Sequence, residues 1–245
     1  MTQPRNWKDK VRSVLPWGTY WFLKRVREEV RAFASNGDMT SLAKIYQTDK
    51  WGYHFYTPVY EQWFKSLRYK PIRLLEIGVG GCAKSQMGGN SLRMWKRYFP
   101  QGQITGIDIY DKSALQENRL KILKGDQTDP IFLKELTNTE GPFDIIIDDG
   151  SHVQSHIITS FETLFPLMNR GGIYVIEDTQ TSYWPKFEGS TAEMRSVPSA
   201  MNYFIKRVHT VNRQEWLQDE QHPELPEEGI GSISFYHNLI FITRK

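Results

Sequence analysis

Cysteine is almost absent from this sequence, because Cys82 is the single one among 245 residues. One cysteine excludes an internal disulfide and a zinc site built from several thiolates. The sequence also lacks a run of about 18 uncharged apolar residues, the length that suggests a membrane-spanning helix. Its N-terminus lacks the apolar segment and cleavage site of a secretory signal. We therefore expect a cytoplasmic protein without a transmembrane segment.

A strong charge of one sign is missing from most of the chain. The net charge is +3, but residues 1–34 hold eight basic and three acidic side chains, which leaves −2 for the remainder. The main part therefore gives no indication of a nucleic-acid-binding surface. In residues 1–38, basic and aromatic side chains are interleaved, which predicts a helical appendage packed on its own domain or on a neighbouring subunit. Contact with a membrane surface is the alternative, and we expect a homo-oligomer.

Short apolar runs follow one another from residue 70 onward, and each run ends in polar or glycine residues. Helix-like stretches separate the first five runs, a pattern typical of an α/β protein with a parallel sheet covered by helices on both faces. Two further runs, joined by the tight "HN" turn, predict an antiparallel hairpin at the C-terminus. The runs are "IRLLEIGVGG", "QITGIDIY", "LKILKGDQTD", "FDIIIDDGSH", "GIYVIEDTQ" and "ISFYHNLIFITRK".

Polar residues at the ends of the first three runs indicate a nucleotide-type ligand, because ligands of such sheets bind at the carboxyl ends of the strands. The first run ends in Glu76 and in the glycines Gly78 and Gly80, where the backbone is able to approach a ligand closely. The second ends in Asp108, an acceptor for ribose hydroxyls. The third ends in Asp126 and Gln127, which we assign to the amino group of an adenine. Helix capping and an ordinary turn are the alternatives for Asp108 and Asp126.

Four carboxylates follow the fourth and fifth runs, namely Asp148, Asp149, Glu177 and Asp178. Such a density of negative charge at one edge of a sheet requires a cation, and oxygen ligands favour Mg²⁺ or Mn²⁺. His152 follows closely and has a pKa range suited to removing a proton from a hydroxyl. The alternative for His152 is a histidine at a helix start that bonds to the backbone.

Several motifs together resemble one family, the class I S-adenosylmethionine-dependent O-methyltransferases of macrolide and related natural-product sugars. They are "YQTDKWGYHFYTPVYEQWF", "LLEIGVGG", "GIDI", "GDQTD", "DDGSH" and "GGIYVIEDTQTSYWP", and the resemblance covers residues 40–245. It implies a seven-stranded, mostly parallel sheet in a methyltransferase domain over residues 39–245. It also implies metal ligands at Asp149, Glu177 and Asp178 and a catalytic base at His152. The implied cofactor contacts are Tyr56, Glu76, Gly78, Gly80, Ser91, Asp108, Asp126, Gln127 and Asp148.

The expected activity is transfer of a methyl group from S-adenosylmethionine to a sugar hydroxyl of a glycosylated natural product or saccharide, assisted by Mg²⁺ or Mn²⁺. Residues 182–230 interrupt the pattern of runs, and we interpret them as a lid or acceptor-binding insertion. Two alternatives stay open. Gly78, Gly80 and Ala83 also satisfy the pattern of a nicotinamide-dependent oxidoreductase, and a non-catalytic S-adenosylmethionine-binding module would keep the same sheet.

Overall fold

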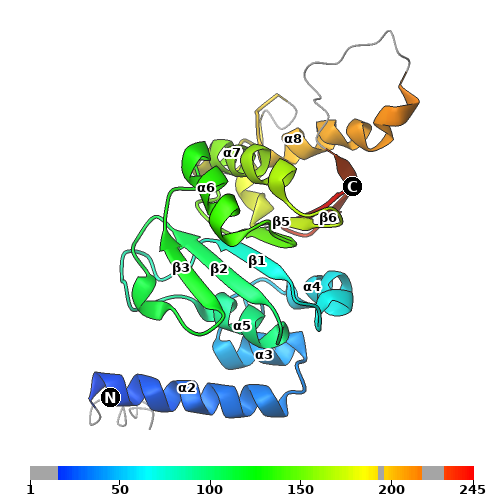
Figure 1. The fold of residues 1–245 in the computed structure, drawn as a ribbon. Coiled ribbons are helices and arrows are strands. Elements are labelled where there is room, and N and C mark those ends of the chain that lie inside the picture. The colour runs from blue at the N-terminus through cyan, green and yellow to red at the C-terminus, as the bar shows by residue number, and fades with distance from the viewer. Residues whose placement is uncertain (1–15, 193–195, 217–228) are drawn as a thin grey trace. The chain divides into compact units, whose positions relative to one another are not determined.

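The computed structural model describes residues 16–192, 196–216 and 229–245, and the chain divides into two compact units, residues 1–65 and 66–245 (Figure 1). The predicted boundary after residue 38 falls inside the first unit. The acidic end of the predicted insertion, "DEQHPELPEE", lies outside the described residues.

The first unit is helical, with α2 (Trp17–Ala34), α3 (Met39–Tyr46) and α4 (Thr57–Phe64). Asp38 caps α3 by accepting a hydrogen bond from the Ser41 backbone nitrogen at 2.7 Å. The Tyr46 hydroxyl donates to Glu29 at 2.6 Å and so ties α3 to α2. The described part of the predicted N-terminal appendage is thus a helix.

The second unit is built on a seven-stranded sheet with the order β3-β2-β1-β4-β5-β7-β6. Strands β1 to β5 are parallel, while β7 runs antiparallel between β5 and β6. The predicted parallel sheet and the C-terminal hairpin are therefore confirmed. The strands are β1 (Arg73–Ile77), β2 (Gln103–Asp108), β3 (Leu120–Lys124), β4 (Ile145–Asp148), β5 (Ile173–Glu177), β6 (Ile230–Tyr236) and β7 (Leu239–Arg244).

Helices cover both faces of this sheet (Figure 1). On one face, α6 (Pro130–Glu140), α7 (Gln154–Leu164) and α8 (Ala200–Arg207) share a buried apolar core with the strands. On the other face, α5 (Asn90–Tyr98) packs on β2 at Gly106, where an added Cβ would lie 2.7 Å from the Leu92 side chain. Nearly every residue of β1, β4 and β5 is buried, which explains why these runs are continuously apolar.

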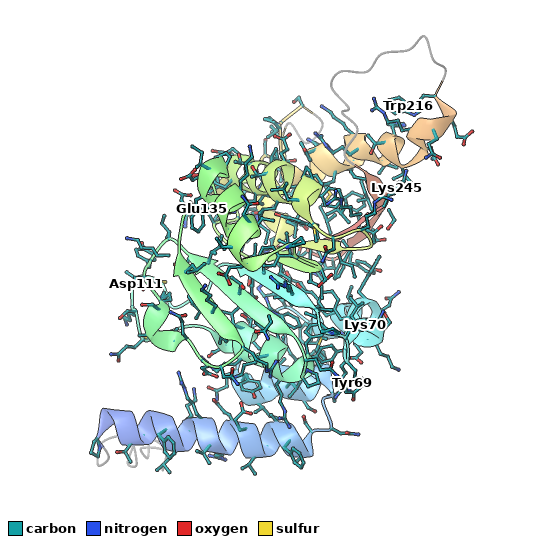
Figure 2. All side chains as sticks on the ribbon, viewed as in Figure 1. Tyr69, Lys70, Asp111, Glu135, Trp216 and Lys245 are labelled. Carbon is teal, nitrogen blue, oxygen red and sulfur yellow. The ribbon has the colours of Figure 1, made fainter. Side chains whose placement is uncertain are left out.

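The described part of the predicted insertion consists of short helices. After β5 come the 3-10 helices η4 (Thr179–Tyr183) and η5 (Pro185–Phe187), and α8 then continues into η6 (Val208–Glu215). Lys245, labelled in Figure 2, donates to the Val211 carbonyl at 3.3 Å and joins the end of β7 to η6. A role as a lid stays a prediction. The remaining 3-10 helices are η1 (Lys65–Leu67), η2 (Ser113–Leu115) and η3 (Phe165–Leu167).

Within the described residues, we find no helix with the length and apolar character needed to cross a membrane.

Candidate metal and cofactor site

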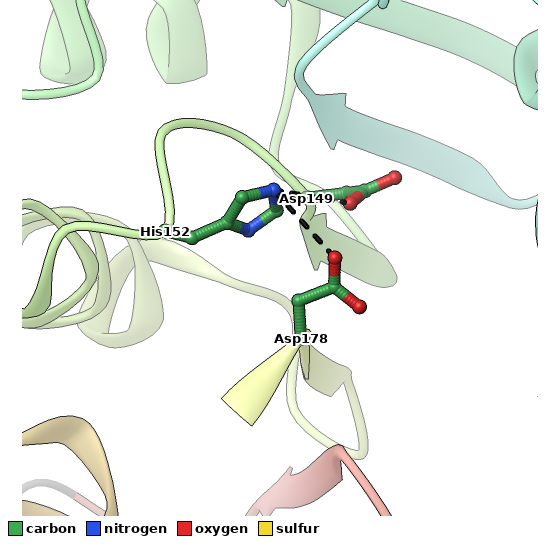
Figure 3. A group of neighbouring side chains, drawn as sticks. All are labelled: Asp149, His152 and Asp178. Carbon is green, nitrogen blue, oxygen red and sulfur yellow. Dashed lines mark ion pairs between the residues drawn. The ribbon is translucent and has the colours of Figure 1, made fainter. Parts of the chain in front are cut away.

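The loops that follow β4 and β5 bring Asp149, His152 and Asp178 together (Figure 3). His152 Nε2 lies 4.0 Å from Asp149 Oδ1 and 3.8 Å from Asp178 Oδ2. One ligand atom from each of the three side chains lies within 4.8 Å of the others. Each side chain is about one-fifth exposed, so the group is open to solvent on one side. Two carboxylates and an imidazole at this spacing suit a divalent cation.

Two of these three residues have left-handed backbone conformations, with φ of 59° at His152 and 55° at Asp178. Such φ values are uncommon outside glycine and persist where the surrounding structure holds them in place. The backbone therefore directs both side chains toward the same point at some cost in stability.

Glu177, the third predicted metal ligand, is the last residue of β5 and is 2% exposed. The group of ligand atoms found among the described residues does not include it. Its role as a ligand stays a prediction, whereas Asp149 and Asp178 do lie side by side as the sequence pattern requires.

Asp148, the last residue of β4, directly precedes Asp149 in the chain and is buried. It accepts hydrogen bonds from Gln127 Nε2 at 3.2 Å and from the Tyr174 hydroxyl at 3.4 Å. Burial raises the pKa of Asp148 to about 6, although the nearby His152 partly opposes this rise. Gln127 also accepts a hydrogen bond from the Ser151 backbone nitrogen at 2.8 Å. Both ends of the Gln127 amide are thus engaged inside the protein, and its predicted adenine contact stays a prediction.

In the metal-free wild type, ionisation of the buried Asp148 is expected to lower the unfolding free energy as the pH rises. Replacing Asp148 with asparagine should remove this decrease. The folded state holds the proton more tightly than the unfolded state, so the stability contributed by neutral Asp148 is complete below about pH 4. It is lost as the pH rises through the folded pKa of about 6. A pKa of about 6 instead of 3.8 corresponds to about 3 kcal/mol at pH 7.

Urea denaturation of chelator-treated wild type and Asp148→Asn between pH 4 and pH 7 checks this expectation. The difference in unfolding free energy between the two proteins should shift in favour of the variant as the pH rises. A difference that is the same at every pH would contradict it.

The loop after β1 approaches the loop after β4 at Gly78. Gly78 has a φ of 95°, and a Cβ added there would lie 2.1 Å from the Asp149 backbone oxygen. A side chain at this position would therefore push the two loops apart. At Gly80, with a φ of 75°, an added Cβ would meet open space, as expected of a position beside a ligand.

Other predicted cofactor residues surround this loop. Asp108 accepts hydrogen bonds from the backbone nitrogens of Val79 at 3.0 Å and Tyr110 at 2.9 Å. Ser91 donates to Glu76 at 2.9 Å. These contacts hold the ends of β1 and β2 close to the start of α5. The structure therefore brings Glu76, Ser91 and Asp108 near Gly78 and Gly80.

Asp126 and Tyr56 have different surroundings. Asp126 lies in an exposed turn, where hydrogen bonds from the Thr128 backbone and hydroxyl lower its pKa. An ordinary turn was the alternative that the sequence indicated for Asp126. Tyr56 belongs to the first unit, where it is stacked on His54 with ring centroids 4.8 Å apart. The cofactor contacts predicted for both residues stay predictions.

Sequence reasoning missed Lys112, which is fully buried beside the same loop. Its Nζ donates to the carbonyl oxygens of Cys82 at 2.5 Å, Lys84 at 2.7 Å and Met87 at 3.1 Å. All three ammonium donors therefore bind the loop that follows Gly81. A lysine in a polar stretch of sequence carries no signal of such a role.

Replacing Lys112 with methionine is expected to weaken S-adenosylhomocysteine binding at least tenfold. The loop would lose three charge-assisted hydrogen bonds, each of them worth about 1.5–3 kcal/mol. Calorimetric titration of S-adenosylhomocysteine measures the effect. Lys121→Met, which removes an exposed lysine paired with Glu140, is the matched control and should bind like wild type. Equal affinities for all three proteins would contradict a role of Lys112 in shaping the cofactor loop.

Comparison with known proteins agrees with the fold of the sheet. No family model matches the sequence. The chain is 41% identical over 222 residues to 8-demethyl-8-α-L-rhamnosyl tetracenomycin-C 2'-O-methyltransferase of Streptomyces olivaceus, covering 89% of this chain and 58% of that protein. It is 42% identical over 209 residues to mycinamicin VI 2''-O-methyltransferase of Micromonospora griseorubida, covering 84% of this chain and 52% of that protein.

A solved structure also resembles the chain. The MycE methyltransferase from the mycinamycin biosynthetic pathway, in complex with Mg and SAH, matches with a TM-score of 0.79 and 41% identity. The match covers 84% of this chain and 53% of MycE. The second unit therefore has the class I methyltransferase fold that the sequence predicted. More particularly, the predicted resemblance to natural-product sugar O-methyltransferases is confirmed, although the chain spans only 52% to 58% of the length of the two relatives named above.

Proposed function

We propose that this protein transfers a methyl group from S-adenosylmethionine to a sugar hydroxyl of a glycosylated natural product or saccharide, with Mg²⁺ or Mn²⁺ as a second cofactor. The observation that carries the proposal is the Asp149, His152 and Asp178 group at the carboxyl ends of adjacent strands, next to a glycine loop. The relatives support it, because the name of one describes O-methylation of a rhamnosyl tetracenomycin and the name of the other describes 2''-O-methylation of mycinamicin VI. The comparisons lend no support to the oxidoreductase alternative.

The carboxylates of Asp149 and Asp178, with Glu177 as the predicted third ligand, would hold the cation. A cation held there would act as a Lewis acid and would lower the pKa of a nearby sugar hydroxyl. The carboxylate oxygens of Asp149 and Asp178 lie within 4.8 Å of each other, a spacing that fits a single ion, and both side chains are partly exposed to solvent.

His152 acts as the general base in this proposal. Its Nε2 lies beyond hydrogen-bond distance of both carboxylates, so it is able to accept a proton from the sugar hydroxyl. As the proton moves to His152, the sugar oxygen forms a bond to the methyl carbon and the carbon–sulfur bond of S-adenosylmethionine breaks. The products are the methyl ether, S-adenosylhomocysteine and protonated His152. The rate depends on alignment of oxygen, carbon and sulfur in line.

Two measurements test the proposed function. Calorimetry should show micromolar binding of S-adenosylmethionine and S-adenosylhomocysteine, with NAD as the competitor that fails to bind. Radiolabelled S-adenosylmethionine should then methylate a member of a panel of rhamnosylated polyketides and macrolides in the presence of Mg²⁺. Failure to bind either sulfur compound would overturn the methyltransferase proposal. Binding of cofactor with transfer to a non-sugar acceptor alone would overturn the acceptor class.

A further inference from the structure

Gln154, the first residue of α7, is fully buried beside the candidate metal site. Its Nε2 donates to the His152 carbonyl at 3.1 Å and to Thr181 Oγ1 at 3.2 Å. Its Oε1 accepts from Ser182 Oγ at 2.9 Å and from the Ala200 backbone nitrogen at 2.8 Å. These four bonds use both donors and both acceptor positions of the amide.

The partners of Gln154 belong to three segments that are distant in sequence. His152 lies in the loop after β4, Thr181 and Ser182 lie in η4 after β5, and Ala200 begins α8. One side chain thus joins both loops of the candidate metal site to α8.

The link from Gln154 continues to the second metal-site loop. Thr181 Oγ1, which accepts from Gln154, donates to the Asp178 carbonyl at 2.9 Å. The Thr181 backbone nitrogen donates to the same carbonyl at 3.0 Å. A continuous path of hydrogen bonds therefore runs from the His152 carbonyl through Gln154 and Thr181 to the Asp178 carbonyl.

Both ends of this path are the residues with left-handed backbones, His152 and Asp178. A left-handed conformation outside glycine needs support from its surroundings. Hydrogen bonds to the carbonyl groups of these two residues restrain the orientation of their peptide planes. In a buried location such bonds are stronger than in water, and leaving one partner unsatisfied is costly.

We propose that Gln154 is a positioning residue that fixes the loop carrying Asp149 and His152 relative to Asp178, and thereby sets the affinity of the site for its cation. This inference rests on the proposed function of the Asp149, His152 and Asp178 group. Gln154 itself touches neither substrate nor cation in this scheme. It acts through the two carbonyl groups, and Thr181 is the second member of the link.

The test measures binding of Mn²⁺ alone by electron paramagnetic resonance, so that it does not depend on an acceptor. Gln154→Ala and Thr181→Val should each raise the Mn²⁺ dissociation constant about 10–100-fold, the effect typical of losing an outer-sphere partner. The double variant should bind about as weakly as the weaker single variant, because both substitutions break the same path. The affinity for S-adenosylhomocysteine should stay within about twofold of wild type, a typical scatter for unrelated sites.

Two controls separate positioning from general destabilisation. Thr181→Ser keeps the hydroxyl and should restore wild-type Mn²⁺ affinity. Ser182→Ala removes a different hydrogen bond to Gln154, one outside the path between His152 and Asp178, and should leave Mn²⁺ affinity unchanged even if thermal stability falls. Thr181→Val keeps the test available if Gln154→Ala fails to fold.

The outcomes distinguish this inference from the proposed function. If wild type binds Mn²⁺ and both Gln154→Ala and Thr181→Val bind it equally well, the role of Gln154 is wrong while the metal site stands. Additive losses of Mn²⁺ affinity in the double variant would also contradict a shared path through Gln154 and Thr181. A loss of Mn²⁺ affinity in Ser182→Ala as large as that in Gln154→Ala would contradict it too. If wild type itself binds no Mn²⁺, the metal part of the proposed function is wrong, and the inference falls with it.

Discussion

Replacement of His152 by alanine is expected to lower kcat about 10²–10⁴-fold, the usual contribution of a general base, while S-adenosylhomocysteine affinity stays close to that of wild type. A protonated sugar hydroxyl is a poor nucleophile, and alanine has no group to accept its proton. The cofactor loop after β1 is held by other contacts, such as the hydrogen bond from Val79 to Asp108, so cofactor binding does not depend on the imidazole.

The measurement compares initial rates of methyl transfer with the titration of S-adenosylhomocysteine and of Mn²⁺. His209→Ala, at an exposed histidine of η6, is the matched control and should retain wild-type kcat. Since His152 lies within the same group of possible ligand atoms as the two aspartates, the Mn²⁺ titration is decisive. A loss of Mn²⁺ affinity as large as that caused by removing a carboxylate would make His152 a ligand and not the base.

Asp178→Asn and Asp149→Asn are each expected to raise the Mg²⁺ concentration needed for half-maximal activity. The increase should exceed roughly 10–100-fold, the usual effect of removing a residue that only supports a metal ligand. The amide keeps the shape of the side chain but removes the negative charge that attracts the cation. Asparagine also tolerates the left-handed conformation of residue 178, so the backbone should be undisturbed. Chelation of the metal should abolish the activity of the wild type.

Activity measured over a range of free Mg²⁺, together with Mn²⁺ binding, checks this prediction. Asp144→Asn provides the control, because Asp144 directly precedes β4, at the end of the strand away from the site. Asp144 accepts hydrogen bonds from the Arg73 backbone nitrogen at 2.8 Å and from Asn169 at 2.8 Å. It should leave the Mg²⁺ requirement unchanged. Activity that persists in chelator, or an unchanged Mg²⁺ requirement in both asparagine variants at the site, would rule out this metal site.

Much of the fold follows from the order of residues along the chain. Continuous apolar runs, such as the three isoleucines Ile145, Ile146 and Ile147 of β4, require cover on both faces of the sheet, and the helix-like stretches between the runs supply it. The polar residues that follow these runs lie at the carboxyl ends of the strands, which places Asp149 and Asp178 at the same edge of a parallel sheet. The strand pairing then confirms that β4 and β5 are neighbours.

Single side chains were harder to assign. Asp126 and Gln127 are adjacent and were assigned to the same adenine contact. In the structure, Asp126 closes an exposed turn with Thr128, whereas Gln127 points to the buried Asp148 and to Ser151. Glu177 and Asp178 differ in the same way, because Glu177 ends a strand inside the protein and Asp178 begins the loop at its edge.

The sequence by itself determined the class of fold, the edge of the sheet that carries the site, and the residues Asp149, His152 and Asp178 that meet there. These properties depend on local patterns, namely apolar periodicity and the polar residues that interrupt it. Only the tertiary structure shows the contacts of Lys112 and Gln154, whose partners lie 25–30 and up to 46 residues away in the sequence. A hydrogen bond between such distant segments depends on how the sheet and its helices pack, so no local sequence pattern predicts it.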